Sequence, residues 1–100
     1  MPNILGTLTT MTVMWPTIPL LGSDDELELA PDGFGYTASI TRRRSDGSAA
    51  WTALPPRGEQ QDAWTAVRLE QGQVIAYSWS GFDVRLDLQT GKEIDRRFTK

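Results

Sequence analysis

The sequence predicts one all-β domain, an antiparallel meander of seven to eight short strands that forms a sandwich or a strongly curved sheet. Three observations lead to this prediction. Short segments alternate apolar and polar residues with a period of two, as half-buried strands do. Turn residues separate these segments every 8–12 positions. The 100 residues correspond to one domain in length, so residues 1–100 are expected to fold as one unit.

The first segment, residues 1–22, carries no charge and is expected to form an N-terminal strand, Leu5 to Trp15, followed by a proline-rich turn. The meander proper then spans residues 23–100. A secretory leader is not expected, because no Lys or Arg precedes the apolar stretch. Five threonines and prolines at positions 2, 16 and 19 argue against a membrane span. We therefore expect a cytoplasmic protein without a membrane partner.

The next strands follow from alternation and turn chemistry. The segments "ELELA", "YTASITRR" and "AAWTAL" are expected to be strands, at Glu26 to Ala30, Tyr36 to Arg43 and Ala49 to Leu54. The turns between them are "PDGFG" and "SDGS", because Pro fixes φ and Asp-Gly accepts the positive φ of tight turns. A further proline pair, in "PPRG", ends the third strand.

The segment "EQQDAWTAVRLEQG", residues 59–72, is ambiguous between helix and strand. Its residues are mostly good helix formers, but its apolar positions form no continuous stripe with a 3.6-residue period. We favour a strand that continues through a Gln-Gly turn into "QVIAYSW". The last two expected strands, "FDVRLDL" and "EIDRRF", form a hairpin across "QTGK", where Gly91 is free to adopt positive φ.

Composition excludes several chemistries. The chain has no cysteine and no histidine, which removes disulfides, thiolate catalysis, Ser-His systems and the usual zinc ligands. The acidic run from Asp24 to Asp32 lacks the pattern of a calcium loop. Asp83 and Asp87 share one strand face, but roughly 13 Å separates them, which is too far for paired glycosidase carboxylates. We expect no enzyme activity, no cofactor and no metal site.

The net charge of −3 arises entirely from the first half of the chain. Residues 1–50 contain six acidic and three basic side chains, whereas residues 51–100 contain seven of each. An acidic balance argues against a nucleic-acid partner, which requires a basic field. It favours a basic protein partner instead.

Two stretches resemble known families. The segments "VRLDLQTGKEIDR" and "GQVIAYSWSG" are similar to the outer hairpin and inner strand of a blade in quinoprotein-type β-propellers. This resemblance implies blade-like meanders, but a closed propeller needs 4–8 blades, more than this chain supplies. The ending "SWSGF…LD…TG…FTK", together with size and acidity, resembles small bacterial β-proteins of the immunity type. That resemblance implies a protein that binds and blocks a toxin.

We therefore expect a non-catalytic protein-binding module, specifically an immunity-type inhibitor that occludes a basic bacterial toxin or effector. The predicted contact residues are Asp24, Asp25, Glu26 and Glu28, with Trp79 as an aromatic anchor. One alternative is a structural domain that self-associates through its strand edges. The other is a small module that binds carbohydrate or another ligand through Trp79 and Tyr77.

Overall fold

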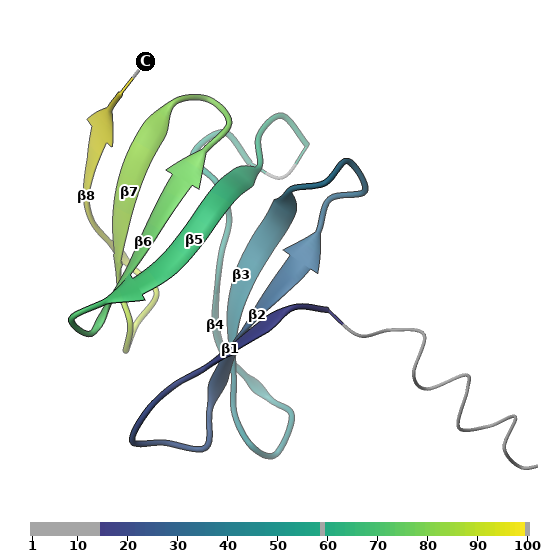
Figure 1. Ribbon diagram of the computed structural model, residues 1–100, viewed down its shortest axis with the longest axis vertical. Coiled ribbons are helices and arrows are strands. Elements are labelled where there is room, and N and C mark those ends of the chain that lie inside the picture. The colour runs from purple at the N-terminus through teal and green to yellow at the C-terminus, as the bar shows by residue number, and fades with distance from the viewer. Residues whose placement is uncertain (1–14, 59, 100) are drawn as a thin grey trace, which may run out of the picture.

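The computed structural model describes residues 15–58 and 60–99 and shows an all-β protein (Figure 1). Every regular element in these ranges is a strand. The eight strands are β1 (Thr17–Pro19), β2 (Glu26–Pro31), β3 (Thr37–Arg43), β4 (Ala49–Ala53), β5 (Trp64–Glu70), β6 (Gln73–Ser78), β7 (Phe82–Asp87) and β8 (Glu93–Phe98). The prediction of an all-β meander of short strands is confirmed.

All eight strands belong to one antiparallel sheet, in the order β1-β2-β3-β5-β6-β7-β8, with β4 paired to β3. Strand β3 has two partners along one edge, because its residues Ile40 to Arg43 pair with β4 whereas Thr37 pairs with Trp64 of β5. The sheet therefore divides beyond β3 into two parts, β1–β4 and β5–β8, which Figure 1 shows side by side. Within residues 15–58 and 60–99 the sheet is not closed into a barrel.

Both parts of the sheet contribute to one hydrophobic core, so the sheet curves over itself. The buried apolar cluster consists of Leu20, Leu27, Ile40, Ala53, Trp64, Val74, Ala76, Val84 and Leu86. Alternate positions along the strands supply these side chains, as the period-two pattern requires. Trp64 is a fully buried member of the cluster and donates from its indole nitrogen to the carbonyl of Ala53, at 3.3 Å. This hydrogen bond joins β5 to β4.

A second contact between the two parts centres on the carbonyl oxygen of Leu88, just after β7. It accepts hydrogen bonds from the indole Nε1 of Trp51, at 2.8 Å, and from Nη1 of Arg42, at 3.1 Å. The ring of Trp51 also lies against Gly91, with φ of +75°, in the β7–β8 turn. These contacts hold the β7–β8 turn against β3 and β4.

The strand bounds agree closely with the expected segments, and residues 64–70 of the ambiguous segment form strand β5 as favoured. The Gln-Gly turn has positive φ at both Gln71 and Gly72 (51° and 78°), as a tight hairpin turn requires. The expected N-terminal strand falls mostly outside the described residues. Within the proline-rich stretch the structure has strand β1 where a turn was expected. Prolines are compatible with β1 because it is the outermost strand of the sheet.

Candidate functional site

Three exposed aromatic side chains gather at one end of the sheet. Phe34 and Tyr36 lie in the β2–β3 turn with 87% and 43% of their surface exposed, and Trp79 lies in the β6–β7 turn with 56% exposed. We call these three residues the aromatic surface. They line a shallow cavity of about 270 Å³ together with Asp32, Gln60, Gln61, Asp62 and Ala63. A cluster of exposed aromatics is a feature of interaction sites more than of ordinary protein surface.

The β2–β3 turn holds two of these aromatics in place. The carboxylate of Asp32 accepts hydrogen bonds from the main-chain N–H groups of Phe34 and Tyr36, at 2.7 and 3.0 Å. The N–H of Asp32 in turn donates to the carbonyl of Tyr36, at 3.0 Å. Aspartate in such a turn replaces a main-chain acceptor and stabilises a tight loop. The backbone beneath Phe34 and Tyr36 is therefore fixed.

Asp62 fixes the turn that carries the third aromatic residue, Trp79, because its carboxylate connects the loop before β5 to the β6–β7 turn. Its buried carboxylate accepts hydrogen bonds from four donors: the N–H of Arg57, the N–H of Ala63, and the N–H and hydroxyl of Ser80. The N–H of Trp79 also donates to the carbonyl of Ala63, at 2.8 Å. Burial by itself would raise the pKa of Asp62. The hydrogen bonds from Ser80, Ala63 and Arg57 outweigh burial and lower the pKa below its ordinary value.

The predicted acidic residues lie elsewhere, at the start of β2. Asp25 forms an ion pair with Arg42 at 2.8 Å, and Glu28 forms one with Arg43 at 2.7 Å. Both carboxylates therefore bind neighbouring strand β3. Asp24 is exposed and Glu26 is half-buried. Neither Asp24 nor Glu26 forms an ion pair within the part of the chain that the structure describes.

The structure does not bring Trp79 to the acidic residues. Trp79 shares its cavity with the turn after β2, whereas Asp24, Asp25 and Glu26 lie before β2 or at its first residue. The six residues of β2 separate the two groups by roughly 17 Å at the usual rise per residue.

Sequence reasoning missed Phe34, Tyr36 and Asp62 as neighbours of Trp79. One signal for Phe34 was present, since it lies inside the turn sequence "PDGFG" and turns run over the protein surface. Tyr77, expected beside Trp79 in the ligand-binding alternative, is half-buried and lies under the guanidinium of Arg68, 5.7 Å from the ring centre.

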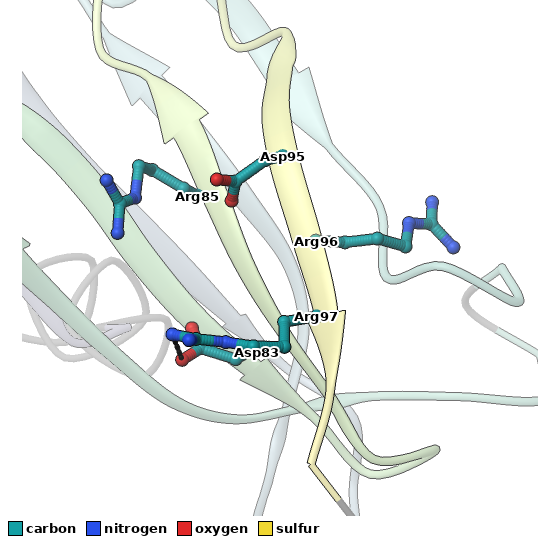
Figure 2. A pocket seen from close by; sticks show the side chains of 5 residues that line it. All are labelled: Asp83, Arg85, Asp95, Arg96 and Arg97. Atoms are coloured by element: carbon teal, nitrogen blue, oxygen red, sulfur yellow. Dashed lines mark ion pairs between the residues drawn. The ribbon is translucent and has the colours of Figure 1, made fainter.

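A second surface of interest is the charged face of β7 and β8, shown in Figure 2. Asp83 and Arg97 point to the same side of the hairpin as Arg85 and Asp95, whereas Arg96 points to the other side. These five residues line a cavity of about 320 Å³. Asp83 and Arg97 form an ion pair at 3.7 Å. Within the described residues, Nε of Arg85 is buried without a hydrogen-bond partner.

The described residues contain no group of three His, Cys, Asp or Glu side chains placed to hold a metal ion. Among the same residues, no helix is long and apolar enough to cross a membrane. Asp83 and Asp87, the two carboxylates on one face of β7, have separate roles. Asp83 pairs with Arg97, and Asp87 accepts hydrogen bonds from the N–H groups of Gln89 and Thr90 in the β7–β8 turn.

Comparison with known proteins shows the family of the chain. No curated protein and no solved structure matches the chain. A family model described as Domain of unknown function (DUF7957) matches residues 32–98, which are 67 of the 100 residues. The matched segment contains the aromatic surface, Asp62 and strand β8, and it begins after the acidic residues of β2. The chain therefore belongs to the DUF7957 family.

Proposed function

We propose that the protein is a non-catalytic protein-binding module whose main contact is the aromatic surface, and that it acts as an immunity-type inhibitor by covering a basic bacterial toxin or effector. The observation that carries this proposal is the fixed cluster of Phe34, Tyr36 and Trp79. Tryptophan and tyrosine are enriched among the residues that dominate binding energy at protein interfaces.

Rigidity supports the proposal as much as composition does. The main-chain atoms beneath all three rings are held by Asp32, Asp62 or Ala63. A surface already ordered before binding loses little conformational entropy when a partner docks. The aromatic surface is therefore suited to a rigid, occluding contact.

The acidic residues contribute a smaller part of the proposed contact. Asp25 and Glu28 are engaged in ion pairs with Arg42 and Arg43, which leaves Asp24 and Glu26 to face a basic partner. Charges at such a distance from the contact centre increase association rates more than affinity.

The first test is affinity capture from the native host with the full chain as bait, followed by titration of the purified partner. Trp79→Ala is expected to weaken binding roughly 30-fold, as loss of an interface anchor does. Leu54→Ala is the matched control, because Leu54 is 50% exposed but does not line the cavity at the aromatic surface. Full affinity of the Trp79 variant would refute the aromatic contact.

Inhibition is tested on the captured partner itself. Its enzymatic activity should fall when the wild-type chain is added in equimolar amounts and should persist with the Trp79→Ala variant. A partner that is not basic, or that keeps full activity in the complex, would refute the toxin-inhibitor part of the proposal.

The acidic contribution is tested with the double variant Asp24→Asn/Glu26→Gln, which leaves the ion pairs of Asp25 and Glu28 intact. The association rate should fall and become less sensitive to salt, while the dissociation rate stays nearly the same. Unchanged association kinetics would remove these two residues from the contact.

The second candidate is a ligand-binding module, because two residues with amide side chains, Gln60 and Gln61, also line the cavity at the aromatic surface. Aromatic rings next to amide groups are suited to a carbohydrate. A fluorescence titration against a panel of glycans tests this candidate. It compares the tryptophan signal of the wild type with that of the Trp79→Ala variant. No change in the wild-type signal with any glycan would refute it.

A further inference from the structure

Strand β8 is an open edge of the sheet. It pairs with β7 and has no second neighbour in the part of the chain that the structure describes. All six of its residues are exposed, and Figure 1 shows β8 as the outermost strand. An open edge presents main-chain N–H and C=O groups to which another strand can pair.

The main-chain hydrogen bonds determine which groups face outward. The N–H of Thr99 donates to the carbonyl of Gly81, at 2.8 Å, so Thr99 directs its main chain toward β7. Main-chain groups alternate in direction along an antiparallel strand. Asp95 and Arg97 therefore bond to β7, whereas Arg96 and Phe98 present their N–H and C=O groups at the open edge.

The side chains of this edge carry opposite charges on one face. Asp95 and Arg97 lie opposite Arg85 and Asp83 of β7 and share the charged face (Figure 2). Within the described residues, the Asp95 carboxylate makes neither a hydrogen bond nor an ion pair. The side chain of Arg97 is 75% exposed and reaches Asp83 only at 3.7 Å. An acid and a base two residues apart are thus both open to a partner.

We propose that two copies of the chain associate antiparallel through β8, around a twofold axis at Arg96. This register places Asp95 of each copy opposite Arg97 of the other, which gives two opposite-charge pairs on one face. It also places the two Arg96 residues opposite each other, where their outward N–H and C=O groups form reciprocal hydrogen bonds.

Main-chain direction and charge together distinguish this register from its neighbours, because the N–H and C=O groups of Asp95 and Arg97 point toward β7. A twofold axis at Asp95 would place the two aspartates opposite each other, and an axis at Arg97 would do the same with two arginines. Like charges directly opposite each other destabilise a strand pair. At the proposed axis the charge of each Arg96 is compensated within its own copy. The guanidinium forms an ion pair with Glu93 at 2.8 Å, and its Cζ lies 5.1 Å from the centre of the Phe82 ring.

The apolar residues of β8 agree with the same register. Phe98 and Ile94 are 61% and 47% exposed, and the proposed pairing brings Phe98 of one copy next to Ile94 of the other. The register of β7 and β8 shifts between Arg85 and Leu86, which leaves Ile94 without a partner on β7. This bulge ends the regular edge, so the interface is short and the association is expected to be weak and concentration-dependent.

The experiment is a charge swap measured by sedimentation velocity on the full chain, from micromolar to millimolar concentration. Asp95→Arg and Arg97→Asp each convert both cross-strand pairs into like charges, so each variant alone should associate roughly tenfold more weakly than the wild type. An equimolar mixture of the two variants should recover the association, because opposite charges then face each other again in both pairs.

Three results would overturn the proposal: a wild type that stays monomeric throughout, single variants that associate as strongly as the wild type, or a mixture that associates no better than its components. Trp79→Ala should leave the association unchanged, which separates this proposal from the function of the aromatic surface. Loss of association in that variant would also overturn it.

Amide hydrogen exchange tests the register residue by residue. Raising the protein concentration should slow exchange at the N–H groups of Arg96 and Phe98, which face the open edge. Exchange at Asp95 and Arg97 should not change, because these groups already bond to β7. Protection that appears elsewhere and not at Arg96 would refute the proposed axis.

Discussion

Strands β7 and β8 form one hairpin with similar alternating sequences, yet their environments are opposite. In β7, Val84 and Leu86 are 1% and 4% exposed, whereas in β8 Ile94 and Phe98 are about half exposed or more. Strand β7 has a neighbour on each side and lies within the core cluster. Strand β8 lies at the edge, outside the cluster. Alternation therefore assigns residues to faces but does not determine whether a face is covered.

The largest expected loss of stability comes from a substitution in β7, the buried strand of this hairpin. Leu86→Ala should lower the free energy of unfolding by about 2–5 kcal/mol, because it removes apolar contacts and leaves a cavity. Ile94→Ala in β8 is the matched control and should change it by no more than about 0.5 kcal/mol. Urea denaturation of both variants measures the contrast. Equal losses would show that β8 is as covered as β7.

The turn between the two strands gives the next effect. A Cβ at Gly91 would lie 2.5 Å from Cδ2 of Trp51, and the φ of Gly91 is +75°. Gly91→Ala should therefore cost about 2–4 kcal/mol, from overpacking and left-handed strain together. Gly47→Ala has a similar φ, +92°, with nothing near its Cβ, and should cost about 1–2 kcal/mol. Equal melting temperatures for the two variants would contradict the contact with Trp51.

Asp62, which fixes the turn that carries Trp79, gives the third effect. Asp62→Asn should cost about 2–3 kcal/mol, because hydrogen bonds to a charged acceptor are lost. The pKa of Asp62 is lower in the folded state, so its stabilisation is complete above the unfolded pKa, about 3.9, and is lost as pH falls through the folded value.

Stability curves of the wild type and the Asp62→Asn variant, measured from neutral pH to below pH of about 3, test this linkage. The difference between the two proteins should shrink as the pH falls below the unfolded pKa of Asp62. Parallel curves across the whole range would refute a charged, hydrogen-bonded Asp62.

The smallest effect concerns the acidic residues. Glu28→Gln removes an ion pair with Arg43 between half-exposed side chains and should cost about 0.2–1 kcal/mol. Asp24→Asn removes an exposed charge and should change stability by no more than about 0.5 kcal/mol. Thermal unfolding at low and high salt distinguishes them, since only the Glu28 contribution should decrease with salt. A larger loss of stability in the Asp24→Asn variant than in the Glu28→Gln variant would contradict this ranking of the two carboxylates.

Much of the fold was predictable because its signals are local. Period-two alternation located β2, β3, β7 and β8, and turn residues such as Asp32-Gly33 and Gln71-Gly72 marked the strand ends. The absence of His and Cys excludes several chemistries by composition alone. The sequence could not predict that Asp25 and Glu28 are paired with arginines, because Arg42 and Arg43 are 15 or more residues away.

The strands, their faces and the turn chemistry follow from the sequence alone, because each depends on residues a few positions apart. Long-range packing, in contrast, establishes which faces are covered and which turns meet. The pairing of β3 with β5 brings the β2–β3 and β6–β7 turns to one end of the sheet. The aromatic surface, Phe34, Tyr36 and Trp79, forms there. That pairing depends on long-range burial around Trp64, for which no short segment of the sequence carries a signal.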